Sequence, residues 1–270
     1  MYFSLTADDG LAYDYHAPAR RDGFTLVCFN PLTGDKSMWQ DGCGTPLIDK
    51  GHGLLSWNLR GQAGSPFTAG EIHDDSIVDD ASRLLHHVNP PNPVFVGLSV
   101  GGLYAAKTHL RQHGLACRGF VLINTLREIG PRLSWINGAL LRLVETGGLD
   151  LLRDAYSPLL MNEDWLEEHR HEFLKSTGYQ PIAKNDGAWQ LLDAGAKTEW
   201  TVDWRDISVP VLNITGLQDH IFRDDEVIAR LLNQFHDVTA LQYADAGHMV
   251  PVERPHRLAK DIHDFVGRLK

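Results

Sequence analysis

The sequence has few cysteines. Only Cys28, Cys43 and Cys117 occur in 270 residues, an odd number without the spacing of a metal site. We interpret them as reduced thiols, which are typical of a cytoplasmic protein rather than of a disulfide-bonded secreted one. The first nine residues contain neither the basic residues nor the apolar run of a secretory signal peptide, which again favours a cytoplasmic location.

The chain also lacks an excess of positive charge and long apolar runs. Its formal net charge is −10 and its lysines and arginines form no run, so neither nucleic acid nor an anionic membrane is expected as a partner. No apolar stretch approaches the roughly 18 residues of a transmembrane helix. What is present is enough chain to bury a substantial hydrophobic core.

Short apolar runs alternate with amphipathic stretches along most of the chain. The first two runs, 2–6 and 11–16, predict a hairpin closed at Asp8-Asp9-Gly10. The later pattern predicts an α/β fold with a mostly parallel central sheet flanked by helices. Its strands are predicted at 25–29, 53–57, 93–96, 119–123, 209–214 and 239–243, and its helices at 72–88, 101–113, 224–235 and 255–269.

The alternation stops between about residues 126 and 204. This stretch reads as helical over 133–144, 149–156, 163–175 and 185–196, and it holds five of the seven tryptophans. We therefore predict a core formed by 1–125 and 205–270. An all-helical cap, 126–204, is inserted after the sixth strand. Open α/β sheets bind ligands at the carboxyl ends of their strands, so the cap is expected over that edge.

The pentapeptide Gly97-Leu98-Ser99-Val100-Gly101 follows one predicted strand directly and precedes a predicted helix. In that context G-x-S-x-G predicts a nucleophile elbow, a tight turn that exposes the serine hydroxyl above the sheet. The glycines keep Cβ atoms out of the turn and let the helix approach closely. Ser99 is thus the candidate nucleophile, and it needs a base and an acid to activate it.

The expected order of the partners in this fold is serine, acid, histidine. His248 lies on the loop after the last predicted strand, and Asp219 lies after the preceding one. His248 would accept the Ser99 proton, and Asp219 would fix the imidazole tautomer. Other aspartates lie near in sequence (Asp224, Asp225 and Asp245), whereas Asn124, at the end of an earlier strand, carries an amide that cannot serve as the acid.

These stretches resemble the α/β-hydrolase superfamily, in particular its capped esterases, lactonases and carbon–carbon hydrolases. The similar segments are 96–102, 209–219 and 246–255, together with Asn58-Leu59-Arg60-Gly61-Gln62-Ala63-Gly64-Ser65, which is similar to the family's Arg-Gly-x-Gly-Ser loop. The resemblance covers the chain outside the cap. It implies the fold and the triad but not the substrate.

The resemblance also implies an oxyanion hole, formed by the backbone N–H groups of Leu32 and Val100. The family usually has His-Gly after the third strand, whereas this chain has Asn30-Pro31. Proline offers no N–H, but the implied donor lies one residue further on. Asn30, His220 and Met249 are further candidates for substrate contact.

The resulting hypothesis is a cofactor-free serine hydrolase for a small-molecule carboxylic ester or lactone with an apolar group. No metal site is expected, because the neighbouring histidines at 86–87 and 169–171 fit solvated faces. Alternatives keep the triad for carbon–carbon bond hydrolysis, acyl transfer, lyase or cofactor-independent oxygenase chemistry. Another alternative is a ligand-binding receptor with a vestigial triad. Oligomeric state stays open.

Overall fold

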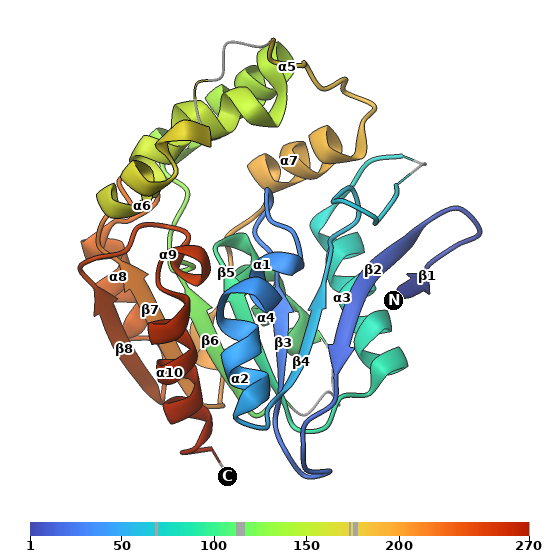
Figure 1. Cartoon of the computed structure of the whole chain (residues 1–270), viewed down its shortest axis with the longest axis vertical. Helices are drawn as coiled ribbons and strands as arrows, with labels where there is room; N and C mark the ends of the chain where they lie inside the picture. The colour runs from blue at the N-terminus through green and yellow to red at the C-terminus, as the bar shows by residue number, and fades with distance from the viewer. Residues whose placement is uncertain (68–69, 112–116, 173, 175–177, 270) are drawn as a thin grey trace.

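The computed structural model describes residues 1–270 except 68–69, 112–116, 173, 175–177 and 270. Within the described residues, eight strands form one sheet in the order β1-β2-β4-β3-β5-β6-β7-β8 (Figure 1). The hairpin strands pair antiparallel, β2 also pairs antiparallel with β4, and the remaining strands are parallel. The strands are β1 (Tyr2–Ser4), β2 (Gly10–His16), β3 (Thr25–Phe29), β4 (Gly53–Trp57), β5 (Pro93–Leu98), β6 (Gly119–Ile123), β7 (Val211–Gly216) and β8 (Val238–Tyr243).

The central strands are buried on both faces, which explains their nearly continuous apolar sequences. Successive side chains point to opposite faces of the sheet. On β3, Val27 and Phe29 join one hydrophobic cluster, whereas Leu26 and Cys28 join another. The first cluster packs against α3 (Asp74–Val88), α4 (Val100–Arg111) and α8 (Asp225–Leu232), and the second against α2 (Thr45–Asp49) and α10 (Pro255–Val266).

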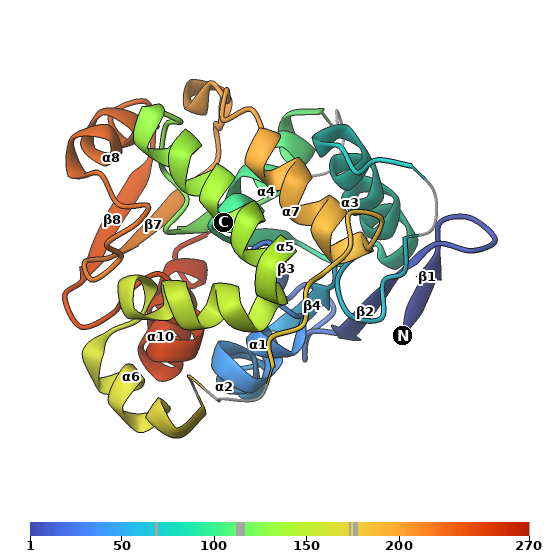
Figure 2. The same ribbon diagram turned by 90° about the horizontal axis from the view of Figure 1, so that it is seen from above.

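Between β6 and β7 the chain forms the helical insert, which we define as α5 (Pro131–Leu160), α6 (Glu163–Glu168), the short helix η2 (Arg170–Glu172) and α7 (Gly187–Lys197). These helices lie beyond the carboxyl ends of the parallel strands (Figure 1). From above, α5 and α7 lie side by side across that edge (Figure 2). The insert is therefore placed to cover the loops that follow the strands.

Each strand of the parallel sheet, β3 to β8, begins and ends within two residues of its predicted bounds. Three features differ. The helices expected at 133–144 and 149–156 form the single element α5, which bends at Gly148, where φ is +72°. The segment 37–49 is helical as α1 (Ser37–Trp39), η1 (Gln40–Gly44) and α2, although Gly42, Gly44 and Pro46 disfavour a helix. The helix expected at 163–175 ends at Glu168 as α6 and is followed by η2. Its residues Phe173 and Lys175, and the end of the helix expected at 101–113, lie outside the described residues.

The three cysteines are buried and free of disulfides, as predicted. Burial raises the pKa of the Cys43 and Cys117 thiols to about 12, so neither is a nucleophile at neutral pH.

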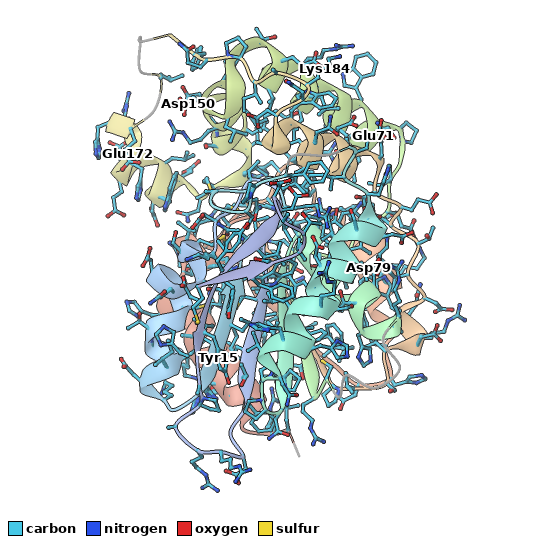
Figure 3. The ribbon with its side chains drawn as sticks, turned by 90° about the vertical axis from the view of Figure 1, so that its right-hand side faces the viewer. Tyr15, Glu71, Asp79, Asp150, Glu172 and Lys184 are labelled. Atoms are coloured by element: carbon cyan, nitrogen blue, oxygen red, sulfur yellow. The ribbon has the colours of Figure 1, made fainter. Side chains whose placement is uncertain are left out.

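Charged side chains such as Asp79 on α3 and Lys184 before α7 lie at the outside of the molecule (Figure 3). Of the helices in the described ranges, none has the length and apolar composition needed to cross a bilayer.

Candidate active site

Ser99 lies in a strained turn between β5 and α4. Its φ is +58°, a left-handed conformation that is uncommon for a residue with a side chain, and its N–H donates to Ile123 O at 2.8 Å. The turn tolerates no extra atoms. A Cβ on Gly97 would lie 2.3 Å from Gly102 Cα, and a Cβ on Gly101 would lie 2.2 Å from Phe29 O. The glycines therefore permit the turn that the motif predicts.

His248 and Asp219 are in direct contact beside this turn. Nδ1 of His248 lies 2.6 Å from Oδ2 of Asp219, and both side chains are buried. The other carboxylate oxygen, Oδ1, accepts the N–H groups of Ile221 at 3.1 Å and Phe222 at 2.9 Å. A carboxylate at Nδ1 favours the tautomer with its proton there, which leaves Nε2 as a proton acceptor. Ser99 and His248 line the same cavity.

The surroundings of Asp219 keep it ionised. Burial alone would raise its pKa, but the charge and hydrogen bond of His248, the Phe222 N–H and the charge of Arg127 together hold the pKa below its ordinary value. Asp219 is therefore a carboxylate at neutral pH.

The neighbouring aspartates are engaged elsewhere. Asp224 caps α8 by accepting the N–H groups of Glu226 and Val227, and Asp225 pairs with Arg223 at 2.6 Å. Asp245 binds the arginines at 254 and 257. Of the candidate acids, the structure brings Asp219 alone to His248.

The two implied oxyanion donors are free. Among the described residues, neither the Leu32 N–H nor the Val100 N–H has a hydrogen-bond partner, and Leu32 lines the cavity together with Ser99. Gln62 holds the loop in place, because its Nε2 donates to Pro31 O at 2.8 Å and to Leu32 O at 3.1 Å. With Asn30-Pro31 in this loop, the Leu32 N–H still has no hydrogen-bond partner among the described residues.

Asn30, a candidate for substrate contact, is not among the residues that line the cavity. The side chain is fully buried. Its Nδ2 donates to Asn58 Oδ1 at 3.0 Å and to Gln62 Oε1 at 2.9 Å, while its Oδ1 accepts Trp39 Nε1 at 2.7 Å. Both amide protons are in use, so Asn30 links the loop after β3, which carries Leu32, to the core.

The other two candidates for substrate contact lie in different places. Met249 lines the cavity beside His248. His220 is an exposed residue that does not line it: its N–H donates to Leu159 O at 2.9 Å, and its carbonyl accepts Arg132 Nη2 at 2.8 Å. Geometry therefore favours Met249 over His220.

Two side chains that the motifs do not identify brace the His248 loop. Asn124 donates to the carbonyls of Gly247 at 3.0 Å and His248 at 2.8 Å, and accepts Gly216 N–H at 2.8 Å. Asn124 lies at the end of β6, and its amide supports the backbone of the His248 loop instead of supplying an acid.

The second brace is Glu253, a buried carboxylate on α9 (Val250–Glu253). It accepts the N–H groups of Gly247 and Met249, each at 2.8 Å, on both sides of His248. It also accepts the Asn162 N–H at 2.7 Å and its Nδ2 at 2.6 Å, which connects the loop to the end of α5.

Arg127 is a third side chain near Ser99 that the motifs do not identify. It follows β6 and is only 5% exposed. Its Nη2 donates to Ser99 Oγ at 2.6 Å and to Asn124 O at 3.1 Å. The rings of Trp200 and Phe222 each lie 4.4 Å from the guanidinium carbon. Burial lowers its pKa to about 10, opposed by the charge of Asp219, so it stays cationic at neutral pH.

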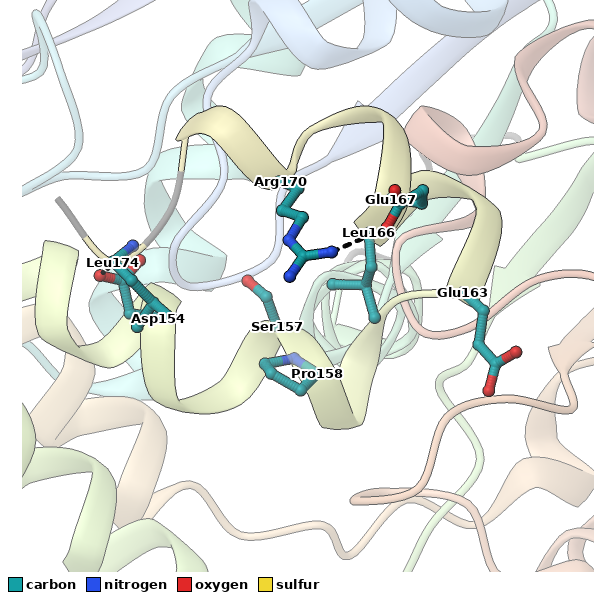
Figure 4. A pocket seen from close by; sticks show the side chains of 8 residues that line it. All are labelled: Asp154, Ser157, Pro158, Glu163, Leu166, Glu167, Arg170 and Leu174. Carbon is teal, nitrogen blue, oxygen red and sulfur yellow. Dashed lines mark hydrogen bonds and ion pairs between the residues drawn. The ribbon is translucent and has the colours of Figure 1, made fainter.

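The cavity above Ser99 has a volume of about 460 Å³. Its walls are mostly apolar and come largely from α5, including Leu140, Leu152 and Tyr156. Within the described residues, no group of three or more His, Cys, Asp or Glu side chains could hold a metal ion. A second cavity of about 340 Å³ lies between α5 and α6 and contains neither Ser99 nor His248 (Figure 4).

The sequence matches the Alpha/beta hydrolase family over residues 26–261, which is most of the chain. The chain belongs to the α/β hydrolase family. This confirms the predicted fold and an enzyme of hydrolase type.

Individual members of the family are similar over nearly the whole length. The chain is 25% identical to 3-oxoadipate enol-lactonase 2 of Acinetobacter baylyi over 93% of this chain and 91% of that protein. Among solved structures, MGS-M2, an α/β hydrolase from a Medee basin deep-sea metagenome, has a TM-score of 0.85 at 17% identity, covering 100% and 98% of the two chains. A malate-bound thermophilic esterase from Thermogutta terrifontis has a TM-score of 0.79 at 22% identity, covering 99% and 98%. At these identities the two structures support the fold.

Proposed function

We propose that this α/β hydrolase cleaves a carboxylic ester or lactone through an acyl-enzyme on Ser99. The observation that carries the proposal is the 2.6 Å contact between His248 Nδ1 and Asp219 Oδ2, next to a serine in a nucleophile elbow. A buried carboxylate and histidine beside such a serine are the parts that nucleophilic acyl transfer requires. The similarity to a lactonase over most of the chain supports the same class of substrate.

In the proposed reaction, Ser99 Oγ attacks the carbonyl carbon and its proton passes to His248 Nε2. The oxyanion accepts the N–H groups of Leu32 and Val100. As the bond to the leaving oxygen breaks, that oxygen takes the proton from His248. Water then attacks the acyl-enzyme, giving its proton to His248, and Ser99 leaves with that proton. With a lactone, the leaving alcohol stays attached to the acyl group.

The helical insert is proposed to act as the cap of the site. It supplies most of the apolar wall above Ser99, including Leu140 and Leu152, and Met249 adds to this wall from the His248 loop. An apolar acyl or alcohol group of moderate size fits a cavity of about 460 Å³.

The test is labelling with a serine-directed fluorophosphonate. The wild-type protein and a Ser157→Ala control should label, because Ser157 lines the same cavity but lies on α5 and not in the elbow. Ser99→Ala and His248→Ala should not. Labelling of Ser99→Ala, or none of the wild-type protein, would contradict the proposal.

A further inference from the structure

The most unusual group near Ser99 is the guanidinium of Arg127. It is buried, yet no carboxylate in the described part of the chain forms an ion pair with it. Asp219, whose charge it senses, gives its oxygens to His248, Ile221 and Phe222 instead. An unpaired buried cation is costly, which suggests that its counter-ion arrives with a ligand.

The free donor of Arg127 points to the form of that ligand. Its Nε is buried and has no hydrogen-bond partner among the described residues, while its Nη2 donates to Ser99 Oγ at 2.6 Å and to Asn124 O at 3.1 Å. Nε and Nη2 are also the two nitrogens through which Arg60 binds the carboxylate of Asp80, each at 2.6 Å. On the corresponding edge of Arg127 the Nε–H is free, and a carboxylate bound there in the same bidentate way takes the place of one of the two Nη2 contacts.

The sheet order separates this edge from the oxyanion hole. Ser99 follows β5, which lies between β3 and β6. Leu32 follows β3, whereas Arg127 follows β6, so the two groups approach Ser99 from opposite sides. Arg127 Nη2 contacts Ser99 Oγ at 2.6 Å. The carbonyl carbon that Oγ attacks becomes bonded to Oγ, so it lies close to the guanidinium. The oxyanion can thus lie on the Leu32 side while another anionic group of the same substrate lies on the Arg127 side.

We propose that Arg127 binds a carboxylate of the substrate, so that this hydrolase selects esters or lactones with a free carboxylate a few bonds from the scissile carbonyl. This rests on the ester or lactone hydrolysis proposed above. The rings of Trp200 and Phe222 hold the guanidinium plane without neutralising it. The apolar cavity above receives the rest of the substrate.

The first experiment compares two methyl esters of similar shape. Monomethyl succinate carries the carboxylate, and methyl 4-oxopentanoate replaces it with a neutral acetyl group. A bidentate contact to a charged group should give the wild type a preference in kcat/KM of about 10- to 100-fold for the carboxylate. Arg127→Met should abolish that preference. The readout is the ratio of the two kcat/KM values, because Arg127 also contacts Ser99 Oγ and its loss acts on both esters. Arg127→Lys, which keeps the charge but not the bidentate edge, should retain part of the preference.

Arg132→Met is the matched control, because Arg132 is an exposed arginine at the start of α5 and should keep the full preference. An equal fall in kcat/KM for both esters in Arg127→Met would show a role in catalysis or folding instead of in selectivity. Unchanged kcat/KM values for both esters would show that Arg127 has no role. Either result overturns the inference. Circular dichroism and a thermal melt establish that each variant is folded. If Arg127→Met does not fold, the partial loss in Arg127→Lys decides the question.

Calorimetric binding of glutarate provides a readout that does not need turnover. The wild type and Arg132→Met should bind glutarate at least about tenfold more tightly than Arg127→Met does, and equal affinities would overturn the inference. If the wild type hydrolyses neutral esters but shows no dependence on Arg127, only the carboxylate inference fails. If it binds glutarate through Arg127 but hydrolyses no ester, the proposed function fails and the carboxylate site stands.

Discussion

At the scale of single residues, the acid is the part of the site with the most competitors in the sequence. Asp219, on the loop after β7, and Asp225, at the start of α8, lie only six residues apart. Yet Asp219 is buried against His248, while Asp225 pairs with Arg223 on the surface. Asp219→Asn should lower kcat about 10³- to 10⁴-fold, because the wrong imidazole tautomer is favoured. Steady-state hydrolysis of a 4-nitrophenyl ester measures this, and Asp225→Asn is the control. Near-normal turnover in Asp219→Asn would remove its assigned role.

The pKa of Asp219 also predicts how stability depends on pH. Because the folded-state pKa lies below the ordinary value, ionised Asp219 stabilises the fold at pH values above that ordinary value. The contribution is lost as the pH falls through the folded-state pKa. The difference in unfolding free energy between the wild type and Asp219→Asn should therefore shrink from about pH 6 to about pH 3. Urea unfolding across this range measures it, and a constant or growing difference would contradict the sign.

At the scale of elements, the loop that carries His248 depends on a carboxylate that no motif identifies. Glu253 accepts backbone N–H groups on both sides of His248 and holds Asn162 at the end of α5. Glu253→Gln replaces one acceptor oxygen with a donor, so it should cost about 1–3 kcal/mol in unfolding free energy. It should also lower kcat about tenfold or more by displacing His248. Urea unfolding and ester hydrolysis measure the two effects.

The exposed Glu172 supplies the control for this element, since Glu172→Gln should change neither quantity. Loss of stability with full activity in Glu253→Gln would mean that the carboxylate supports the fold but not the position of His248.

Substituting alanine for glycine should have opposite effects on stability at two positions, Gly101 in the elbow and Gly138 in α5. In Gly101→Ala the new Cβ would lie 2.2 Å from Phe29 O, a backbone atom that cannot move away cheaply, so unfolding free energy should fall by about 1–3 kcal/mol or more. Gly138 has no atom within 4 Å of its Cβ position and lies inside α5. Gly138→Ala should stabilise by about 0.5–1 kcal/mol. Thermal unfolding of both variants measures these changes. Equal effects of the two substitutions on stability would contradict the prediction.

The elements that the sequence predicts are those with a local signal. Periodic apolar residues predict the strands, and Gly97, Ser99 and Gly101 predict the elbow. Helix 37–49 has no such signal, because its glycines are required by close contacts: a Cβ on Gly42 would lie 2.5 Å from Pro251 O, and one on Gly44 would lie 2.6 Å from Trp39 O. Arg127 has no signal either, since one arginine after a strand does not indicate which side chains will enclose it. Tertiary packing, which the sequence does not display, decides both.

At the scale of the whole molecule, the motifs come from the sheet and its loops, while the cavity walls come mainly from the insert. The placement of the insert depends on contacts between distant glycines and the core. A Cβ on Gly195 would meet Leu32 Cδ1 at 2.2 Å, and one on Gly61 would meet Gly187 O at 2.3 Å. These contacts set α7 against the loop after β3 and the loop after β4. Helical periodicity predicts that the insert is helical, but not that it closes over Ser99.

If the insert sets the size of the acyl group, narrowing its wall should change selectivity without changing the chemistry. Leu140 on α5 lines the cavity and is partly buried, so Leu140→Trp adds volume there. We expect kcat/KM for a 4-nitrophenyl octanoate ester to fall about tenfold or more, and for the acetate about threefold at most, because each lost methylene contact costs on the order of 1 kcal/mol. Trp135→Leu, at a position 81% exposed on the same helix, should leave both values unchanged. An equal fall for the two esters in Leu140→Trp would mean that the insert affects catalysis at Ser99 itself and does not select the acyl chain.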